Sequence, residues 1–333
     1  MDLTALEQLL ADRGEPASRA TQVWEWVAHG ASSYGEMSNL PLALRGALTE
    51  TLPLSSLDLR GEQIAADGTV KALLRTADGR PLETVLMRYR DGRQSVCVSS
   101  QSGCPLTCTF CATGAMRFGR NLTAGEILDQ VLHFRRRDAR SAPSHLVFMG
   151  MGEPMLNLDN VLAACRRLPD LGITHRRTAI STVGWIPGIE RLAASDMPLR
   201  LALSLHAADD ALRSELMPVN DRYPLADVLA ACREYHERRR RRVFVEYVML
   251  AGVNDRSEQA VALARVLDPA IFKVNLIPYN PTDSPYEGSG RAAIAAFKAT
   301  LEQRGLPATV RLTRGRDIDA ACGQLAGRAT TAA

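Results

Sequence analysis

From about residue 94 onward, short apolar runs of strand length alternate with longer stretches in which apolar residues recur at helical spacing. Runs such as "HLVFMG" (145–150) and "VFVEYVML" (243–250) are typical of buried strands. Regular alternation of strands and helices predicts a parallel sheet with right-handed crossovers. The candidate strands lie at residues 95–100, 145–150, 178–182, 201–206, 243–250, 273–279 and 308–313. About six strand–helix units indicate an α/β fold built as a partial (β/α)6 barrel, in which the chemistry gathers at the carboxyl ends of the strands.

The first 93 residues follow a different pattern. Three amphipathic segments, "LTALEQLLADRG", "RATQVWEWVAHG" and "PLALRGALTETL", predict helices. Short apolar runs separated by "AADG", "TADG" and "YRDG" then predict antiparallel hairpins. We therefore expect a helical domain at residues 1–52, a short β-hairpin segment at 53–93, the barrel at 94–327 and a tail at 328–333.

The composition indicates the kind of protein, its location and the possible roles of its cysteines. The chain has 333 residues and is 46% apolar, which is enough for a sizeable core, and it has no apolar run long enough to span a membrane. The amino terminus lacks the pattern of a secretory signal, so we expect a reducing, cytoplasmic location, where structural disulfides are rare. The seven cysteines are then expected to be metal ligands, catalytic groups or core residues.

Net charge is only +3, but basic residues cluster locally in "HFRRRDAR" (133–140), "HRR" (175–177) and "HERRRRR" (236–242). Each cluster alone is typical of the carboxyl end of a solvated helix. Taken together, the three clusters favour a nucleic-acid partner.

Three cysteines, Cys104, Cys108 and Cys111, share one loop of the sequence "SSQSGCPLTCTFCATG". Structural zinc requires four ligands, usually in two close pairs, and no second pair is present. Iron–sulfur clusters are held by thiolates in tight loops of this kind. A [4Fe-4S] cluster with three cysteine ligands leaves one iron open for a substrate or cofactor. The alternative from another class is a non-catalytic iron–sulfur protein, either an RNA-binding sensor or an electron carrier. An electron carrier would be expected to close its cluster with a fourth cysteine.

The segment "CPLTCTFC", with Phe110 directly before the last cysteine, resembles the signature of the radical S-adenosylmethionine (SAM) enzymes. The resemblance implies that SAM binds the open iron and is cleaved by one electron to a 5′-deoxyadenosyl radical. It also implies that the partial barrel is a radical-SAM barrel.

The other four cysteines divide into two groups. Cys165 and Cys232 lie on apolar helix faces, where cysteine behaves as a small apolar residue. Cys97 precedes the three-cysteine loop, and Cys322 lies in "GRDIDAACGQLAG". Their own sequence surroundings leave open whether these two are core residues or reactive thiols.

Ten separated segments, in order, resemble one family. They are "QVWEWVAHG" with "YGEMSNLP", "CVSSQSGC", "NLTAGEI", "FMGMGEPMLN", "STVGWIPGI", "SLHA", "MPVNDRYP", "EYVMLAGVND", "NLIPYNP" and "TRGRDIDAACGQLAG". The family is that of the adenosine carbon-2 methyltransferases of ribosomal and transfer RNA, the RlmN type.

This resemblance implies roles for particular residues. Gly152 and Glu153 would hold the amino group of SAM, and further SAM contacts would come from Ser181, Ser204, Leu205, His206 and Asn280. Cys322 would carry a methyl group, and Cys97 would resolve a covalent RNA adduct by forming a disulfide with Cys322. Glu83 would accept a proton, although an exposed glutamate on a strand is the alternative interpretation of that position.

The family's reaction sets the expected partners. Two molecules of SAM would be consumed per turnover, with 23S rRNA as substrate and the adenosine 3′ of the tRNA anticodon as a second candidate. A low-potential donor such as flavodoxin would supply the electron, and nothing in the sequence favours an assembly larger than a monomer. The Cfr-type methyltransferases, which modify carbon 8 and give antibiotic resistance, are the nearest alternative because "DQVLHF" and "MPVNDRYP" resemble that type.

Overall fold

The computed structural model describes residues 1–137 and 142–327. The last part of the first basic cluster and the predicted tail, residues 138–140 and 328–333, lie outside the described residues. No described helix has the length and apolar character needed to cross a membrane.

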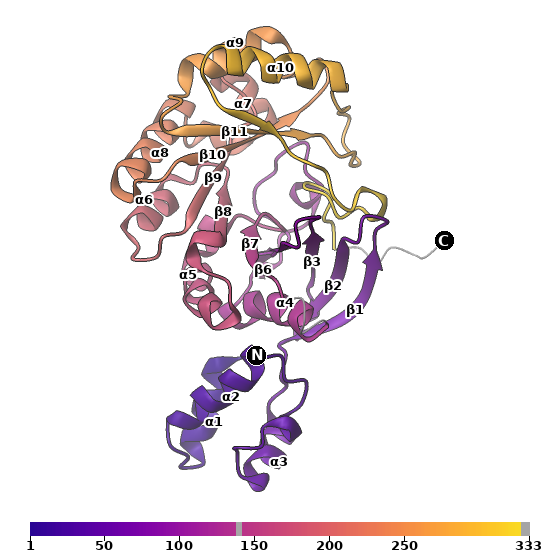
Figure 1. The fold of residues 1–333 in the computed structure, drawn as a ribbon, viewed down its shortest axis with the longest axis vertical. Helices are drawn as coiled ribbons and strands as arrows, with labels where there is room; N and C mark the ends of the chain where they lie inside the picture. Colours follow the sequence, from indigo (N-terminus) through magenta and orange to yellow (C-terminus); the bar gives the residue numbers. More distant parts are fainter. Residues whose placement is uncertain (138–141, 328–333) are drawn as a thin grey trace.

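One ten-stranded sheet organises the molecule, and it curves into an open barrel (Figure 1). Its strands run in the order β1-β2-β3-β4-β7-β8-β9-β10-β11-β12, and those from β4 to β12 are parallel. All seven strands predicted from residue 94 onward are present. They are β4 (Gln94–Cys97), β7 (His145–Phe148), β8 (Thr178–Thr182), β9 (Arg200–Ser204), β10 (Val243–Met249), β11 (Phe272–Pro278) and β12 (Ala308–Val310).

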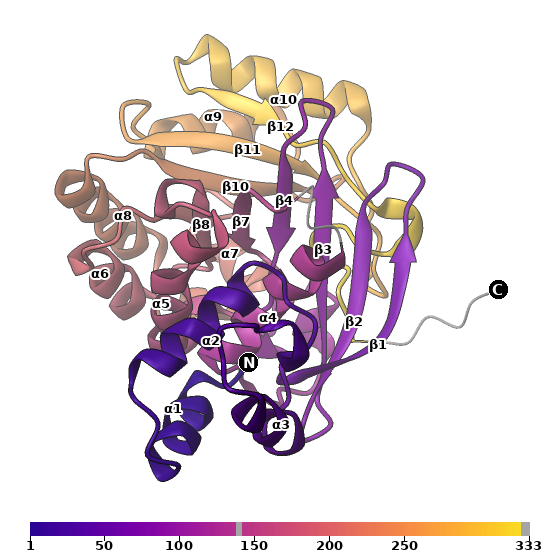
Figure 2. The ribbon, with the colours of Figure 1, turned by 60° about the horizontal axis from the view of Figure 1, so that its bottom comes forward.

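Helices connect the parallel strands and cover the outer face of the sheet (Figures 1 and 2). They are α4 (Ala124–Arg137), α5 (Leu158–Arg167), α6 (Ile186–Ala194), α7 (Asp210–Leu216), α8 (Leu225–Arg239), α9 (Ser257–Val266) and α10 (Arg291–Gln303). The first of them begins with a capping box, because Thr123 Oγ1 accepts from Glu126 N while Glu126 Oε2 accepts from Thr123 N. The predicted partial (β/α)6 barrel is confirmed: six strand–helix units are followed by β12.

The predicted hairpins extend the same sheet. Strands β1 (Leu57–Ile64), β2 (Val70–Thr76) and β3 (Pro81–Arg88) are antiparallel, and β3 pairs with β4. A separate ribbon of β5 (Gln101–Ser102) and β6 (Arg120–Asn121) brackets the three-cysteine loop. The carboxyl-terminal segment returns to the hairpin strands (Figure 1).

The three predicted amino-terminal helices are α1 (Leu3–Asp12), α2 (Ser18–Ala28) and α3 (Leu42–Thr51), and they form a lobe beside the barrel (Figure 1). Arg136 at the end of α4 donates to the carbonyl oxygens of Ala31 and Leu54. Trp24 Nε1 donates to Asp170 at 2.7 Å. Part of the first basic cluster is therefore engaged in contacts within the protein.

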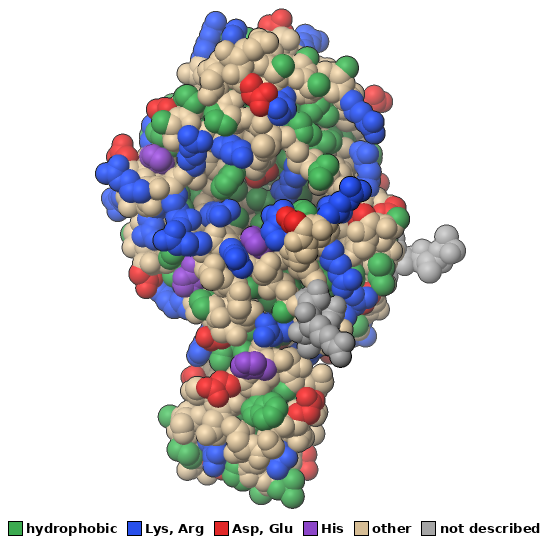
Figure 3. Space-filling model, in the orientation of Figure 1, with side chains coloured by type: hydrophobic (Ala, Val, Ile, Leu, Met, Phe, Trp, Pro, Cys, Tyr) green, Lys and Arg blue, Asp and Glu red, His purple; other side chains and the backbone are tan. Residues whose placement is uncertain are grey.

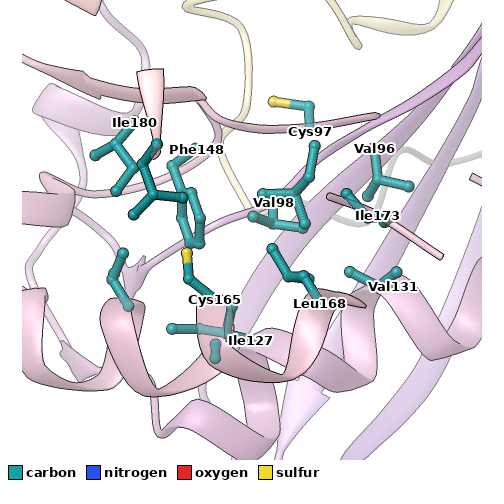
Figure 4. Close-up of a cluster of buried hydrophobic side chains, with 14 of the residues drawn as sticks. Val96, Cys97, Val98, Ile127, Val131, Phe148, Cys165, Leu168, Ile173 and Ile180 are labelled. Carbon is teal, nitrogen blue, oxygen red and sulfur yellow. The ribbon is translucent and has the colours of Figure 1, made fainter. Parts of the chain in front are cut away.

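The interior confirms the assignment of two cysteines to the core. Cys165 and Cys232 have no exposed surface. Figure 4 shows Cys165 among Ile127, Phe148 and Leu168, whereas Cys97 points away from this cluster, on the other side of its strand from Val98. Because successive side chains of a strand point to opposite faces, Cys97 is directed into the barrel.

Candidate active site

A cavity of about 780 Å³ lies at the carboxyl ends of the parallel strands. Each of the strands β7 to β11 contributes wall residues from its last positions or from the loop that follows, and Arg311 follows β12. Phe110 and Cys111 form the side nearest the three-cysteine loop. The cavity is therefore at the edge of the sheet where this kind of fold places its chemistry.

The three-cysteine loop folds tightly because two glycines allow close backbone contacts. A Cβ on Gly103, which has φ of +74°, would lie 2.6 Å from Arg117 O, and a Cβ on Gly114 would lie 2.8 Å from Cys108 O. Ala112 N donates to Gly323 O at 2.8 Å, so the loop is also tied to the segment that carries Cys322.

The three thiols of this loop are all shielded from water, and this changes their pKa values. Burial raises the pKa of Cys104 to about 12 and also raises the pKa values of Cys108 and Cys111. A bound metal is what makes such thiols ligate as thiolates. Among the described residues, no group of three His, Cys, Asp or Glu side chains is arranged to hold a metal ion.

Glu153 is buried at the cavity wall with both carboxylate oxygens engaged. Oε1 accepts from Met155 N at 3.1 Å, and Oε2 accepts from Val183 N at 3.0 Å. Desolvation nonetheless raises the pKa of Glu153 to about 7. Gly152, with φ of +93°, is needed because a Cβ there would lie 2.5 Å from the side chain of Gln101. A buried acid without a basic partner fits a cationic ligand group.

His206 faces the same cavity as a neutral ring. Burial lowers its pKa to about 3, and its Nδ1 accepts from Val248 N at 3.1 Å. Its Nε2 therefore carries the proton and is a donor. The ring packs edge-on against Phe110, with centroids 4.8 Å apart, and its φ of 63° is in the left-handed region.

Ser181 and Ser204 also line the cavity, with their hydroxyl oxygens 3.3 Å apart. Leu205 is not brought to the wall. Its side chain has no exposed surface, and its backbone N donates to Glu246 O.

A second cavity, of about 500 Å³, adjoins the first and shares Met149, Ile277, Arg311 and Cys322 with it. It contains both Cys97 and Cys322, which are separated by 225 positions in sequence (322 − 97). Desolvation and the charge of Cys322 raise the pKa of Cys97 to about 12. All seven cysteines are free, so the pair expected to form a disulfide is present as two thiols.

Asn280 connects this second cavity to the Cys322 segment. Its Nδ2 donates to Cys322 O at 3.1 Å, while its buried Oδ1 has no hydrogen-bond partner among the described residues. An unsatisfied acceptor in a buried position costs free energy unless a ligand donates to it. Asn280 is thus a ligand-contact candidate on the side of Cys322.

Arg311 is a functional candidate that was missed at the sequence level. It lines both cavities, its Nη1 lies 3.6 Å from Glu246 Oε2, and it donates to the sulfur of Met149. The neighbouring Cys322 and Glu246 charges raise the pKa of Arg311. The only signal in the sequence was one charged residue inside the apolar run "ATVRLT".

Glu83 is buried, so the interpretation of this residue as an exposed strand glutamate is wrong. Its Oε1 lies 3.1 Å from Lys71 Nζ, and its Oε2 accepts from the backbone N–H groups of Ala326 and Gly327. It lines a third cavity, of about 1370 Å³, together with Cys111. Glu83 therefore anchors the segment that carries Cys322.

The fold and the three-cysteine loop define the class of protein. A family model described as "Radical SAM superfamily" matches residues 98–264. A solved radical SAM methyltransferase from Sphaerobacter thermophilus is 45% identical, with a TM-score of 0.93 and coverage of 98% of each chain.

The comparisons also identify the family within that class. A model described as "Ribosomal RNA large subunit methyltransferase N-terminal domain" matches residues 1–53. A relative from Chloroflexus aurantiacus, named a probable dual-specificity RNA methyltransferase RlmN, is 48% identical over 98% of this chain and 92% of its own length. The relative from Anaeromyxobacter sp., named a dual-specificity RNA methyltransferase RlmN, is 45% identical over 98% of this chain and 89% of its own length. The chain belongs to the RlmN-type family of radical SAM RNA methyltransferases.

Proposed function

We propose that this protein methylates carbon 2 of one adenosine in 23S rRNA and of the adenosine 3′ of the tRNA anticodon. The names of the two relatives, which specify dual-specificity RNA methylation, support two RNA substrates. The motifs "MGEP", "IPYNP" and "LTRGRDIDAACG" favour carbon 2 over carbon 8.

One observation carries the proposal. Cys97 and Cys322 line one cavity, and that cavity adjoins the one bounded by the three-cysteine loop. A simple SAM methyltransferase needs no cysteine pair beside its cofactor. Adenine carbon 2 is electron-poor and cannot attack a methyl sulfonium directly, so a carrier thiol and a resolving thiol are the groups such a reaction requires.

The residues present fit the two cofactors. Cys104, Cys108 and Cys111 would hold the [4Fe-4S] cluster, and Glu153 would receive the amino group of SAM, with Ser181, Ser204 and His206 on the adjoining wall. When bound, the cluster and SAM supply methyl groups and a 5′-deoxyadenosyl radical. A low-potential donor such as flavodoxin supplies the electron.

The protein's own residues then act in sequence. Cys322 takes a methyl group by substitution at its thiolate, and the carbon of that methyl group later gives up one hydrogen atom to the 5′-deoxyadenosyl radical. The carbon radical on Cys322 bonds to adenine carbon 2, giving a covalent protein–RNA adduct. The adduct would then lose the ring proton to a base of the protein, and the cluster that Cys104, Cys108 and Cys111 would hold would take back one electron. Cys97 then attacks the sulfur of Cys322. The sulfur–carbon bond breaks, a disulfide forms, and the freed carbon is protonated to the methyl group.

Glu83 is the proposed acceptor of the ring proton. Its carboxylate accepts from the backbone N–H groups of Ala326 and Gly327, and so it contacts the segment that carries Cys322. Since both of its oxygens are engaged, proton transfer requires the Cys322 segment to shift away from β3, which carries Glu83.

The decisive experiment is an anaerobic reaction of the reconstituted protein with SAM, a reductant and either an rRNA fragment or tRNA. Nuclease digestion and mass spectrometry against both methyladenosine standards then identify the product. We expect 2-methyladenosine in both RNAs. Formation of 8-methyladenosine would indicate the Cfr-type reaction instead. Product in only one of the two RNAs would show that the other RNA is not a substrate.

A further inference from the structure

Arginines gather at the amino ends of three neighbouring strands, on the edge of the sheet opposite the cavities. Arg176 and Arg177 directly precede β8, Arg200 begins β9, and Arg241 and Arg242 directly precede β10. These five residues are called the amino-edge patch. Two of the basic clusters in the sequence meet here, although they are separated by about 60 positions along the chain.

The strand register explains why the arginines come together. Arg200 pairs with Ala179, and Phe244 pairs with Ala202, so continuation of the register sets Arg242 opposite Arg200. Neighbouring strands are about 4.8 Å apart. Figure 3 shows Lys and Arg side chains gathered on the left of the face in view, over the region where Figure 1 places α6, α8 and β8.

The arginines of the patch are not neutralised by ion pairs in the described part of the chain. Within the described ranges, none of its five arginines forms an ion pair, although Arg238 and Arg239 beside it are engaged with Glu234 and with backbone carbonyls, respectively. All of the patch except Arg241 is exposed. The pKa of Arg241 is lowered, first by burial and then by neighbouring charges that include Arg176 and Arg200. The arginines of the patch therefore influence one another electrostatically.

Like charges held this close repel one another and favour an anionic partner. Arginine presents a planar fork of donors that matches phosphate oxygens. We infer that the amino-edge patch is a second binding surface for the phosphate backbone of folded RNA, distinct from the surface around the catalytic cavities. This inference rests on the proposed function, which makes RNA the substrate.

The location of the patch favours RNA over an acidic electron-donor protein. A donor must approach the cluster, whereas strand β10, with 7 residues, separates the two edges of the sheet. At about 3.3 Å per residue, that separation is roughly 23 Å. A folded RNA is wide enough to bind the patch while its target base enters the cavity at the other edge, but a short oligonucleotide is not.

The test compares three triple variants. R177Q/R200Q/R242Q removes three charges from the patch, and R177K/R200K/R242K retains them. R256Q/R265Q/R304Q removes the same number of charges from exposed positions at α9 and after α10. Binding of a folded rRNA fragment, and of a short oligonucleotide with only the target adenosine and its nearest neighbours, is measured over a range of salt concentrations.

We expect R177Q/R200Q/R242Q to bind folded RNA roughly tenfold or more weakly at low salt, with a smaller dependence on salt. Its binding of the oligonucleotide should be unchanged, and the lysine variant and the α9–α10 variant should resemble the wild type. Equal weakening by the two glutamine variants would overturn the proposal. So would unchanged RNA binding together with slower reduction by a protein donor but not by dithionite. Because RNA binding is measured separately from methylation, failure of this inference can be distinguished from failure of the proposed function.

Discussion

The two ends of the parallel strands present opposite kinds of chemistry. At the carboxyl ends, titratable groups are buried and shifted: Glu153 has a pKa raised to about 7, and His206 is neutral. At the amino ends, four of the five arginines of the amino-edge patch are exposed, and within the described residues none of the five forms an ion pair. In strand β9 these two environments are separated only by the residues between Arg200 and Ser204.

The difference follows from how the sheet is closed. The carboxyl ends are covered by the three-cysteine loop and by the segment of Cys322, which are joined through Ala112 and Gly323. Cover excludes water, and exclusion of water strengthens electrostatic effects and shifts pKa values. The amino ends have no such cover in the described structure, so charge there acts over long range on large partners. We therefore propose that catalysis and RNA capture take place at different edges of the sheet.

The largest expected effect comes from the three-cysteine loop. Cys108→Ala should abolish methylation and SAM cleavage because one cluster ligand is lost. Cys165→Ala is the matched control: it should cost about 1 kcal/mol of stability while leaving the iron content unchanged. Iron analysis, visible absorption and thermal unfolding measure these outcomes. A normal iron content in Cys108→Ala would show that Cys108 is not a ligand of the cluster.

Replacing the two thiols of the second cavity should stop the reaction at different stages. Cys97→Ala should accumulate a covalent protein–RNA adduct, visible on a denaturing gel, because nothing releases Cys322. Cys322→Ala should retain the cluster but form neither adduct nor product. Cys232→Ala, a core substitution, should form product. Absence of an adduct in Cys97→Ala with normal iron content would contradict the resolving role.

Glu83 should matter less than the thiols. Glu83→Gln should slow methylation by roughly a hundredfold if the carboxylate accepts the ring proton. Because Gln can still accept one backbone N–H bond, anchoring of Ala326 is partly retained. The measurement is release of deuterium from RNA labelled at adenine carbon 2, alongside the methylation state of Cys322. Wild-type rates of deuterium release and methylation in Glu83→Gln would leave Glu83 with an anchoring role alone.

Glu153 gives the smallest of these effects and a pH dependence. Its pKa is raised to about 7, so the carboxyl is mostly neutral below that pH and ionised above it. Only the ionised form attracts the ammonium group of SAM, so SAM affinity should increase as pH rises from 6 to 8, by up to about tenfold. Titration calorimetry should show this rise in the wild type and a flat profile in Glu153→Gln. The same rise in Glu153→Gln would assign the ionisation to another group.

Sequence reasoning succeeded where local pattern and spacing determine structure. The seven parallel strands, the hairpins and the amino-terminal helices follow from apolar periodicity. The candidate residues near the cavities came from motif resemblance. That signal selects positions but not contacts, so it does not reveal that the side chain of Leu205 lies in the core.

What the sequence left unpredicted depends on tertiary contact. Arg311 reaches the wall between the two cavities only because β12 closes beside β11. Glu83 is buried because the Cys322 segment folds over it. The separate basic clusters had the same appearance in sequence, yet Arg136 supports the amino-terminal lobe, whereas Arg177 and Arg242 meet on one edge.

The central claim is that three protein thiols leave one iron free to bind and cleave SAM. The most direct measurement is the EPR spectrum of the anaerobically reconstituted, reduced protein with and without SAM, together with chromatography for 5′-deoxyadenosine. We predict that SAM changes the spectrum and that 5′-deoxyadenosine forms. An unchanged spectrum with no 5′-deoxyadenosine, in protein that contains its full complement of iron, would contradict the account.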